Sequence, residues 1–197
     1  QHQIETVGIV RAEETEQESA MLTDAKRWGM RIVHVSRQEY RQRNDADYQQ
    51  RLKERFAPCL LIPEGGNSVE GARGCGPIAE LIQHNAAWAK RIVLPVGTGT
   101  TLAGLAAALD DHYEVLGISA LKGVINLEQQ VQDLLGKLTT DRHARWRILH
   151  DYHCGGFARV NPPLREFMLA FESAHGVQLD PVYTGKMLFA IYQLCER

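Results

Sequence analysis

Cysteine is scarce in this 197-residue sequence, and its four copies are widely spread. They form no C-x-x-C pair, the spacing typical of zinc sites and redox motifs. Histidine is scattered too, and His150 and His153 make up the one close pair. No cluster of carboxylates accompanies that pair, so the sequence predicts neither a metal site nor a disulfide framework.

Long apolar runs and an excess of charge of one sign are also missing. No apolar stretch reaches the roughly 20 residues that a membrane helix requires. The formal net charge is -2 and there is no long basic run, which removes the electrostatic footprint of nucleic-acid binding. Because 44% of the residues are hydrophobic, the chain can bury a sizeable core. We therefore expect a cytoplasmic protein that binds neither membranes nor nucleic acid.

The most informative stretch that is present is a glycine-threonine loop between a predicted strand and a predicted helix. A β-branched segment, residues 92–96, precedes the loop, and a helix-forming segment, residues 102–109, follows it. The first N–H groups of a helix have no partner inside the helix and carry the positive end of its dipole, so they favour an anion. The pattern predicts a phosphate site at Gly97, Thr98, Gly99, Thr100 and Thr101.

The same loop lacks the residues of nucleotide sites. A nucleoside-triphosphate loop needs Lys followed by Ser or Thr, but no lysine lies between Lys90 and Lys122. A dinucleotide fingerprint needs a third glycine where Leu102 stands and an acidic residue where residues 119–121 read Ser-Ala-Leu. These departures disfavour a nicotinamide-dependent oxidoreductase. One phosphate, on a small cofactor or sugar, fits better, and the alternative is a turn that binds no ligand.

The remaining pattern predicts an α/β fold, because short apolar segments alternate with helical ones. The stretch from Arg37 to Arg55 is strongly polar, so we expect a solvated helix or a connector there and a boundary between residues 42 and 43. The turn Gly65-Gly66-Asn67 follows an expected strand, and it either lines the same crevice as the glycine-threonine loop or is a plain turn. Strands are expected at residues 6–10, 31–35, 58–63, 92–96, 114–119 and 146–149, and one helix is expected over 69–85.

Three segments together resemble one enzyme family. Glycine-threonine loops are common to many phosphate binders, whereas the block at residues 180–186 is specific. The sequence is similar over nearly all its length to the pyridoxal-phosphate-dependent family of 1-aminocyclopropane-1-carboxylate deaminases and D-cysteine desulfhydrases. The segments are Pro63-x-Gly65-Gly66-Asn67, the loop Gly97-Thr98-Gly99-Thr100-Thr101, and the block Asp180-Pro181-Val182-Tyr183-Thr184-Gly185-Lys186.

The resemblance implies a fold, a cofactor and partners. The fold is tryptophan synthase β-like, known as fold type II of pyridoxal-phosphate enzymes: an α/β, two-lobed structure of open twisted parallel sheets with helices on both faces. Residues 1–42 would be the remainder of the small lobe, and residues 43–197 would belong to the large cofactor-binding lobe. The cofactor implied is pyridoxal 5'-phosphate, the substrate is a small amino acid, and the assembly is a homodimer.

The resemblance also implies roles for single residues. The loop from Gly97 to Thr101 would hold the cofactor phosphate, and Tyr183 would act on the cofactor or substrate as an acid/base or stacking group. Thr184 stands near the pyridine ring, where the deaminases carry a glutamate, which favours the desulfhydrase branch. Phe157 stands where the family has a second tyrosine, which disfavours ring opening that depends on two tyrosines.

Family segments that do not occur in this sequence shape the expected function. They are the Gly-Asn-Lys segment with its Schiff-base lysine, the Ser-Asn-His segment that receives the substrate carboxylate, and the C-terminal His-Thr-Gly-Gly turn. By the match, Lys186 begins a helix and is not the cofactor lysine. We therefore expect the middle of a longer protein, a lyase or deaminase when intact and inactive by itself. A non-catalytic phosphate-ligand-binding α/β module is the alternative.

Overall fold

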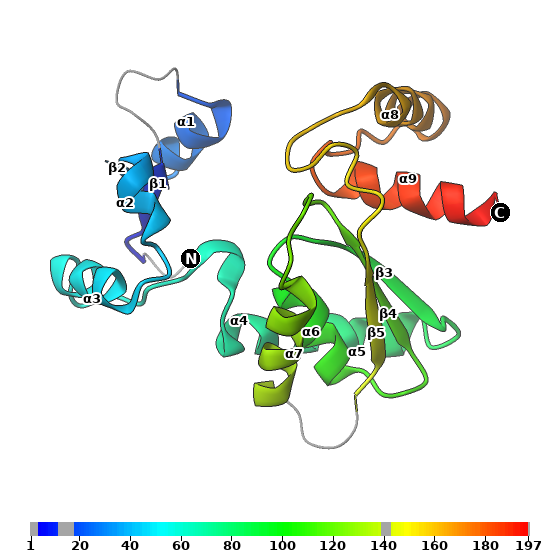
Figure 1. The fold of residues 1–197 in the computed structure, drawn as a ribbon, viewed down its shortest axis with the longest axis horizontal. Helices are drawn as coiled ribbons and strands as arrows, with labels where there is room; N and C mark the ends of the chain where they lie inside the picture. Colours follow the sequence, from blue (N-terminus) through cyan, green and yellow to red (C-terminus); the bar gives the residue numbers. More distant parts are fainter. Residues whose placement is uncertain (1–3, 12–17, 139–142, 197) are drawn as a thin grey trace. The chain divides into compact units, whose positions relative to one another are not determined.

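The computed structural model describes residues 4–11, 18–138 and 143–196. The chain forms two compact units, Gln1–Pro63 and Glu64–Arg197, and both are drawn in Figure 1. Each unit contains its own parallel sheet, as the alternation of apolar and helical segments predicts. No helix in the described ranges is long and apolar enough to cross a bilayer.

The first unit begins with a β-α-β element. Strands β1 (Val7–Arg11) and β2 (Arg31–Val35) pair in parallel, and α1 (Ala20–Arg27) connects them. The side chain of Ser19 accepts a hydrogen bond from the amide of Leu22 (3.4 Å), and this cap sets the start of the helix. The first two predicted strands are confirmed.

The polar stretch forms two helices, α2 (Arg37–Arg41) and α3 (Ala46–Arg55). Tyr48 and Leu52 of α3 are buried, and the Tyr48 hydroxyl donates to a carboxylate oxygen of Glu39 in α2 (3.1 Å). These contacts join α3 to α2. The division between the compact units accordingly falls after residue 63, whereas the expected lobe boundary lies between residues 42 and 43.

The strand predicted at residues 58–63 is wrong. Those residues form no strand, and Leu60 and Ile62 are 87% and 72% exposed. An extended apolar segment becomes a strand only when a neighbour pairs its N–H and C=O groups. None of the described strands pairs with this segment, so its apolar residues stay outside a sheet.

The second unit is built on a three-stranded parallel sheet in the order β3-β4-β5. Helices α6 and α7 make the two crossovers, so strands that follow each other in sequence are neighbours (Figure 1). All three carboxyl ends lie at one edge, where ligands bind in open α/β sheets. The elements of this unit are η1 (Glu64–Gly66), α4 (Val69–Arg73), α5 (Gly76–Asn85), β3 (Arg91–Val96), α6 (Thr100–Ala108), β4 (Glu114–Ser119), α7 (Leu127–Leu138), β5 (Arg145–Leu149), α8 (Pro162–His175) and α9 (Thr184–Cys195).

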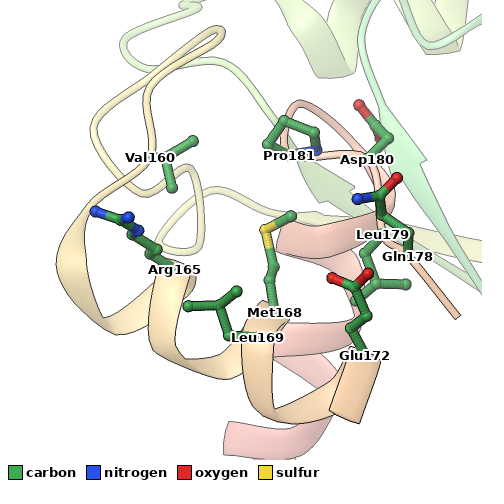
Figure 2. A pocket seen from close by; sticks show the side chains of 9 residues that line it. All are labelled: Val160, Arg165, Met168, Leu169, Glu172, Gln178, Leu179, Asp180 and Pro181. Atoms are coloured by element: carbon green, nitrogen blue, oxygen red, sulfur yellow. The ribbon is translucent and has the colours of Figure 1, made fainter. Parts of the chain in front are cut away.

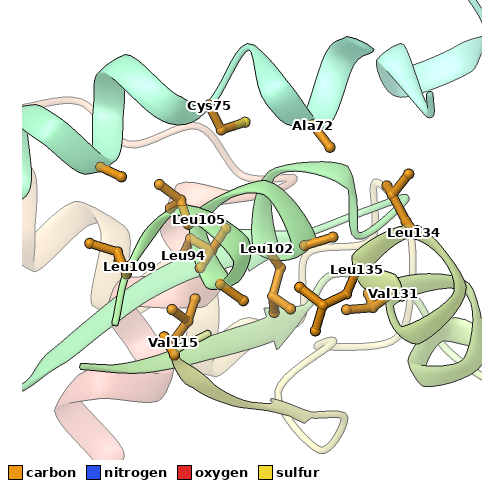
Figure 3. Close-up of a cluster of buried hydrophobic side chains, with 14 of the residues drawn as sticks. Ala72, Cys75, Leu94, Leu102, Leu105, Leu109, Val115, Val131, Leu134 and Leu135 are labelled. Carbon is orange, nitrogen blue, oxygen red and sulfur yellow. The ribbon is translucent and has the colours of Figure 1, made fainter. Parts of the chain in front are cut away.

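Helices cover both faces of this sheet, as predicted. On one face, α6 and α7 share the main core with Val115 of β4 (Figure 3). On the other face, Ala190 of α9 packs with Leu116 and Ile118. Because side chains alternate along a strand, successive residues of β4 enter the two cores in turn. Because β4 is buried on both faces, apolar residues follow one another along it without alternation. This continuous apolar run is the pattern that predicts the strand.

Close packing between α4 and α6 depends on a glycine. The single helix predicted over residues 69–85 is in fact two, α4 and α5, which meet at Gly74 and Cys75. A Cβ atom added at Gly104 of α6 would collide with the carbonyl oxygen of Ala72 in α4 and lie 2.9 Å from the Cβ of Cys75. The two helices therefore approach each other where one side chain is missing.

We expect Gly104→Ala to lower the free energy of unfolding by about 1–3 kcal/mol, because the added methyl group forces α4 and α6 apart. Gly136→Ala in α7 is the matched control, since a Cβ there meets nothing within 4 Å. Alanine favours helix over glycine, so the control should gain about 0.5–1 kcal/mol. Urea unfolding followed by circular dichroism measures both. Equal effects of the two substitutions would contradict the packing argument.

Candidate phosphate-binding site

The predicted loop lies at the carboxyl end of β3 and forms the start of α6. Gly99 is the residue before the helix and has φ +82°, a left-handed conformation that glycine adopts at low cost. No described side chain caps this helix, and its first backbone bond runs from the Ala103 amide to the Gly99 carbonyl (2.9 Å). The earlier N–H groups of the turn are therefore available to an anion.

The threonines of the loop differ in their surroundings. The hydroxyls of Thr98 and Thr100 lie 2.9 Å apart and are hydrogen-bonded. Thr100 is buried and also donates to the amide oxygen of Asn67 (3.5 Å), whereas Thr101 is exposed. Burial raises the pKa of the nearby Cys75 thiol, and a hydrogen bond with Thr101 partly offsets the effect.

The Gly65-Gly66-Asn67 turn lies against this loop. A Cβ atom added at Gly65 would lie 2.6 Å from the Cγ2 atom of Thr98, and Asn67 accepts the hydrogen bond from Thr100. Of the two interpretations that the sequence leaves open, the structure favours the one in which the turn adjoins the glycine-threonine loop. The missing side chain at Gly65 makes room for Thr98.

Tyr183 approaches the loop from α9. A Cβ atom added at Gly97 would lie 3.3 Å from the Tyr183 hydroxyl oxygen, so the phenol rests where Gly97 has no side chain. Burial raises the pKa of Tyr183, and the charges of Asp180 and Glu64 raise it further. The hydroxyl therefore stays protonated at neutral pH and can donate a hydrogen bond. The ring of Phe157 meets the Tyr183 ring edge-on, with centroids 6.3 Å apart and an interplanar angle of 67°.

Asp180 shapes the turn that presents Tyr183. Its carboxylate accepts hydrogen bonds from the amides of Val182 (2.9 Å), Tyr183 (2.9 Å) and Thr184 (2.8 Å). Partial burial raises the pKa of Asp180, but these hydrogen bonds outweigh it, and the pKa lies below its ordinary value. The Thr184 hydroxyl is engaged in the same turn, because it accepts from the Asp180 amide (3.2 Å). Thr184 itself is exposed.

Lys186 lies in the first turn of α9 and is fully buried. Its position at a helix start, predicted from the resemblance, is confirmed. The ammonium group donates to the carbonyl oxygens of Gly156 (2.7 Å) and Ala120 (3.3 Å). Burial lowers the pKa of Lys186, while Cys154 and Asp180 act in the opposite direction. Sequence reasoning missed these bonds, because lysine is almost never fully buried and its acceptors are remote in the chain.

The two close histidines make separate contacts. His150 hydrogen-bonds with the carboxylate of Glu128, and the Nδ1 atom of His153 accepts from the amide of Gly155 (2.9 Å). Among the residues that the structure describes, no group of three or more His, Cys, Asp or Glu could hold a metal ion.

A separate pocket of about 630 Å³ lies between α8 and residues 178–181 (Figure 2). Apolar side chains such as Met168 and Leu169 line it together with Arg165 and Glu172. Asp180 belongs to its wall, but the residues that line it include none of the glycine-threonine loop. The glycine-threonine loop is therefore not part of this pocket.

Comparisons with known proteins bear on both the fold and the ancestry of the chain. No family model matches it. D-cysteine desulfhydrase of Salmonella paratyphi C is 32% identical over 143 residues, which are 68% of this chain and 43% of that protein. A putative 1-aminocyclopropane-1-carboxylate deaminase of Pyrococcus furiosus is 29% identical over 157 residues, 74% of this chain and 48% of that protein. The chain thus spans about half the length of these curated relatives.

A crystal structure of an ACC deaminase homologue matches the fold. The match covers 97% of this chain and 61% of the chain in that crystal structure, with a TM-score of 0.72 and 22% sequence identity. This likeness confirms the predicted α/β fold, with parallel sheets and helices on both faces.

We expect Asp180→Ala to lower the free energy of unfolding by about 1 kcal/mol at pH 7, because three amides before and at the start of α9 lose their acceptor. Asp111→Ala, at an exposed position, is the control and should change little.

The effect of Asp180 should depend on pH. A carboxyl group with a lowered pKa stabilises the fold above its ordinary pKa of about 4, and the contribution is lost as the pH falls through the lowered value. The difference between wild type and Asp180→Ala should therefore shrink in acid. A constant difference from pH 7 to pH 3, in thermal unfolding, would show that the carboxylate charge is not the stabilising group.

Proposed function

The chain belongs to the family of 1-aminocyclopropane-1-carboxylate deaminases and D-cysteine desulfhydrases, and from that premise we propose that the complete protein is a pyridoxal-phosphate-dependent lyase or deaminase of a small amino acid. The observation that supports this most is the approach of Tyr183 to the loop at Gly97. An acid/base group and an anion site then stand side by side.

The residues at the loop fit the phosphate of this cofactor. The uncapped start of α6 offers N–H groups, and the hydroxyls of Thr98 and Thr100 lie beside it. We propose that the loop from Gly97 to Thr101 holds the phosphate through these donors. When bound, pyridoxal phosphate acts as an electron sink for negative charge at the α-carbon of an amino acid.

The side chains around the loop have distinct proposed tasks. Burial and the charges of Asp180 and Glu64 raise the pKa of Tyr183, so its hydroxyl stays protonated. Its position at Gly97 makes it our proposed donor of a hydrogen bond and of a proton to the reacting molecule. Phe157 offers no second hydroxyl beside it. This supports the desulfhydrase branch, in which sulfide leaves D-cysteine, over opening of a cyclopropane ring. The Thr184 hydroxyl is hydrogen-bonded within the Asp180 turn. Thr184 would therefore contact the cofactor only through its exposed atoms.

For the 197 residues alone we propose no turnover. Lys186 is the lysine nearest to Tyr183 in the sequence, and its ammonium group is buried and bonded to two carbonyl oxygens. A lysine held in this way is not free to react with a carbonyl group.

The activity test uses the full-length protein with pyridoxal phosphate and D-cysteine, and sulfide release is measured. Tyr183→Phe should lower the rate about 100-fold, because the proton donor is lost while the ring remains. Tyr192→Phe is the control and should keep the wild-type rate, since Tyr192 lies on α9 against Phe167. Release of ammonia from 1-aminocyclopropane-1-carboxylate without sulfide release would favour the deaminase branch instead. Cofactor binding without either reaction would support a non-catalytic module.

Binding of the phosphate group is tested separately by calorimetry with pyridoxal phosphate. Thr100→Val removes one hydroxyl and keeps the shape, and we expect the Kd to rise about tenfold, as for a lost hydrogen bond to a charged group. Thr23→Val in α1 is the matched control and should leave the Kd unchanged. An unchanged Kd for Thr100→Val would place the phosphate elsewhere.

A further inference from the structure

A fully buried lysine whose hydrogen bonds, among the described residues, go to backbone carbonyl oxygens calls for a physical reason. Lys186 has the largest of the fully buried side chains, and its two hydrogen-bond acceptors among the described residues are backbone carbonyl oxygens. Burying an ammonium group is costly unless its N–H groups are satisfied. The bonds to Ala120 and Gly156 therefore have to be kept, and they fix the segments that carry those carbonyls.

The first acceptor connects Lys186 to the phosphate loop. Ala120 follows the last residue of β4, and its amide donates to the carbonyl oxygen of Val96 (3.1 Å). Val96 is the last residue of β3 and immediately precedes Gly97. Two hydrogen bonds and one peptide link thus lead from the ammonium group to the loop.

The second acceptor connects Lys186 to the aromatic pair. Gly156 immediately precedes Phe157, and Tyr183 stands three residues before Lys186, next to the start of α9. Gly156 has φ +114°, a conformation that other residues rarely adopt, so its carbonyl direction depends on glycine. The same lysine is therefore connected to both rings, to Phe157 through the carbonyl of the preceding residue and to Tyr183 through three residues of backbone.

We propose that Lys186 is a positioning residue that sets the aromatic pair of Tyr183 and Phe157 at a fixed distance from the phosphate loop. It would govern the affinity for the ring portion of a phosphate-bearing ligand and leave the affinity for the phosphate itself nearly unchanged. The inference rests on the proposed function in one respect, the choice of pyridoxal phosphate as that ligand.

The test compares two probes, pyridoxal phosphate and inorganic phosphate, on the full-length protein by calorimetry. For Lys186→Met we expect the Kd for pyridoxal phosphate to rise about 30-fold, the scale of one or two lost hydrogen bonds of a charged donor, with the Kd for inorganic phosphate within about threefold of wild type. A purely structural role would weaken both probes equally, and that result would overturn the proposal.

A second variant covers the case in which Lys186→Met does not fold. Gly156→Ala disturbs one acceptor carbonyl, while the ammonium group keeps its hydrogen bond to the Ala120 carbonyl, and it should produce the same selective loss. Gly123→Ala is the matched control, because Gly123 also has a positive φ (+73°) and a Cβ there meets nothing within 4 Å. The control should bind both probes like wild type.

The outcomes separate this inference from the proposed function. Wild-type affinity of Lys186→Met or Gly156→Ala for pyridoxal phosphate would overturn the inference alone. Failure of the wild-type protein to bind pyridoxal phosphate would overturn the proposed function and the inference together. In a double-mutant cycle on the affinity for pyridoxal phosphate, Lys186→Met and Phe157→Ala should be strongly non-additive, since one side chain acts through the other. Additive effects would contradict that coupling.

Discussion

The buried ammonium group of Lys186 is the constraint on which the arrangement at the carboxyl edge of the sheet depends. Its hydrogen bonds must be kept, because an unsatisfied buried charge costs far more than one hydrogen bond contributes. Satisfying them requires the end of β4, the loop before Phe157 and the first turn of α9 to keep fixed mutual positions. The sheet fixes the end of β4. Through its hydrogen bonds, Lys186 fixes the loop before Phe157 and the first turn of α9 relative to that point.

The block at residues 180–186 then acts as one structural unit. Asp180 accepts three amide hydrogen bonds and closes the turn, and the Thr184 hydroxyl completes it. A Cβ atom at Gly185 would lie 2.8 Å from the Asp180 carbonyl oxygen, so that position requires a missing side chain. Lys186 anchors the far end. Asp180, Thr184 and Gly185 each have a physical reason within the turn, whereas the reason for Lys186 lies in acceptors that are remote in the sequence.

Elements whose cause is local were predictable from the sequence, and those whose cause is remote were not. Strand β4 at residues 114–119 and the glycine-threonine turn that leads into α6 follow from adjacent residues alone. The apolar run at 58–63 resembles a strand equally well, but no described strand pairs with it. The acceptors of Lys186 lie 66 and 30 positions away in the sequence. No pattern of neighbouring residues reports such bonds.

The distinction between local and remote causes also applies to the residues around Tyr183. In the 180–186 block, Asp180, Thr184 and Gly185 form the turn, and Lys186 bonds to two remote carbonyls. Tyr183 is the residue whose ring rests against Gly97. The most specific part of the sequence therefore describes how the Tyr183 hydroxyl is presented to the loop, and much less which molecule would receive a proton from it under the proposed function. Under the proposed function, selection among substrates would come from side chains that lie beside Tyr183 but have no part in the turn. Phe157 meets that condition, because its ring lies against Tyr183 while its backbone belongs to another loop.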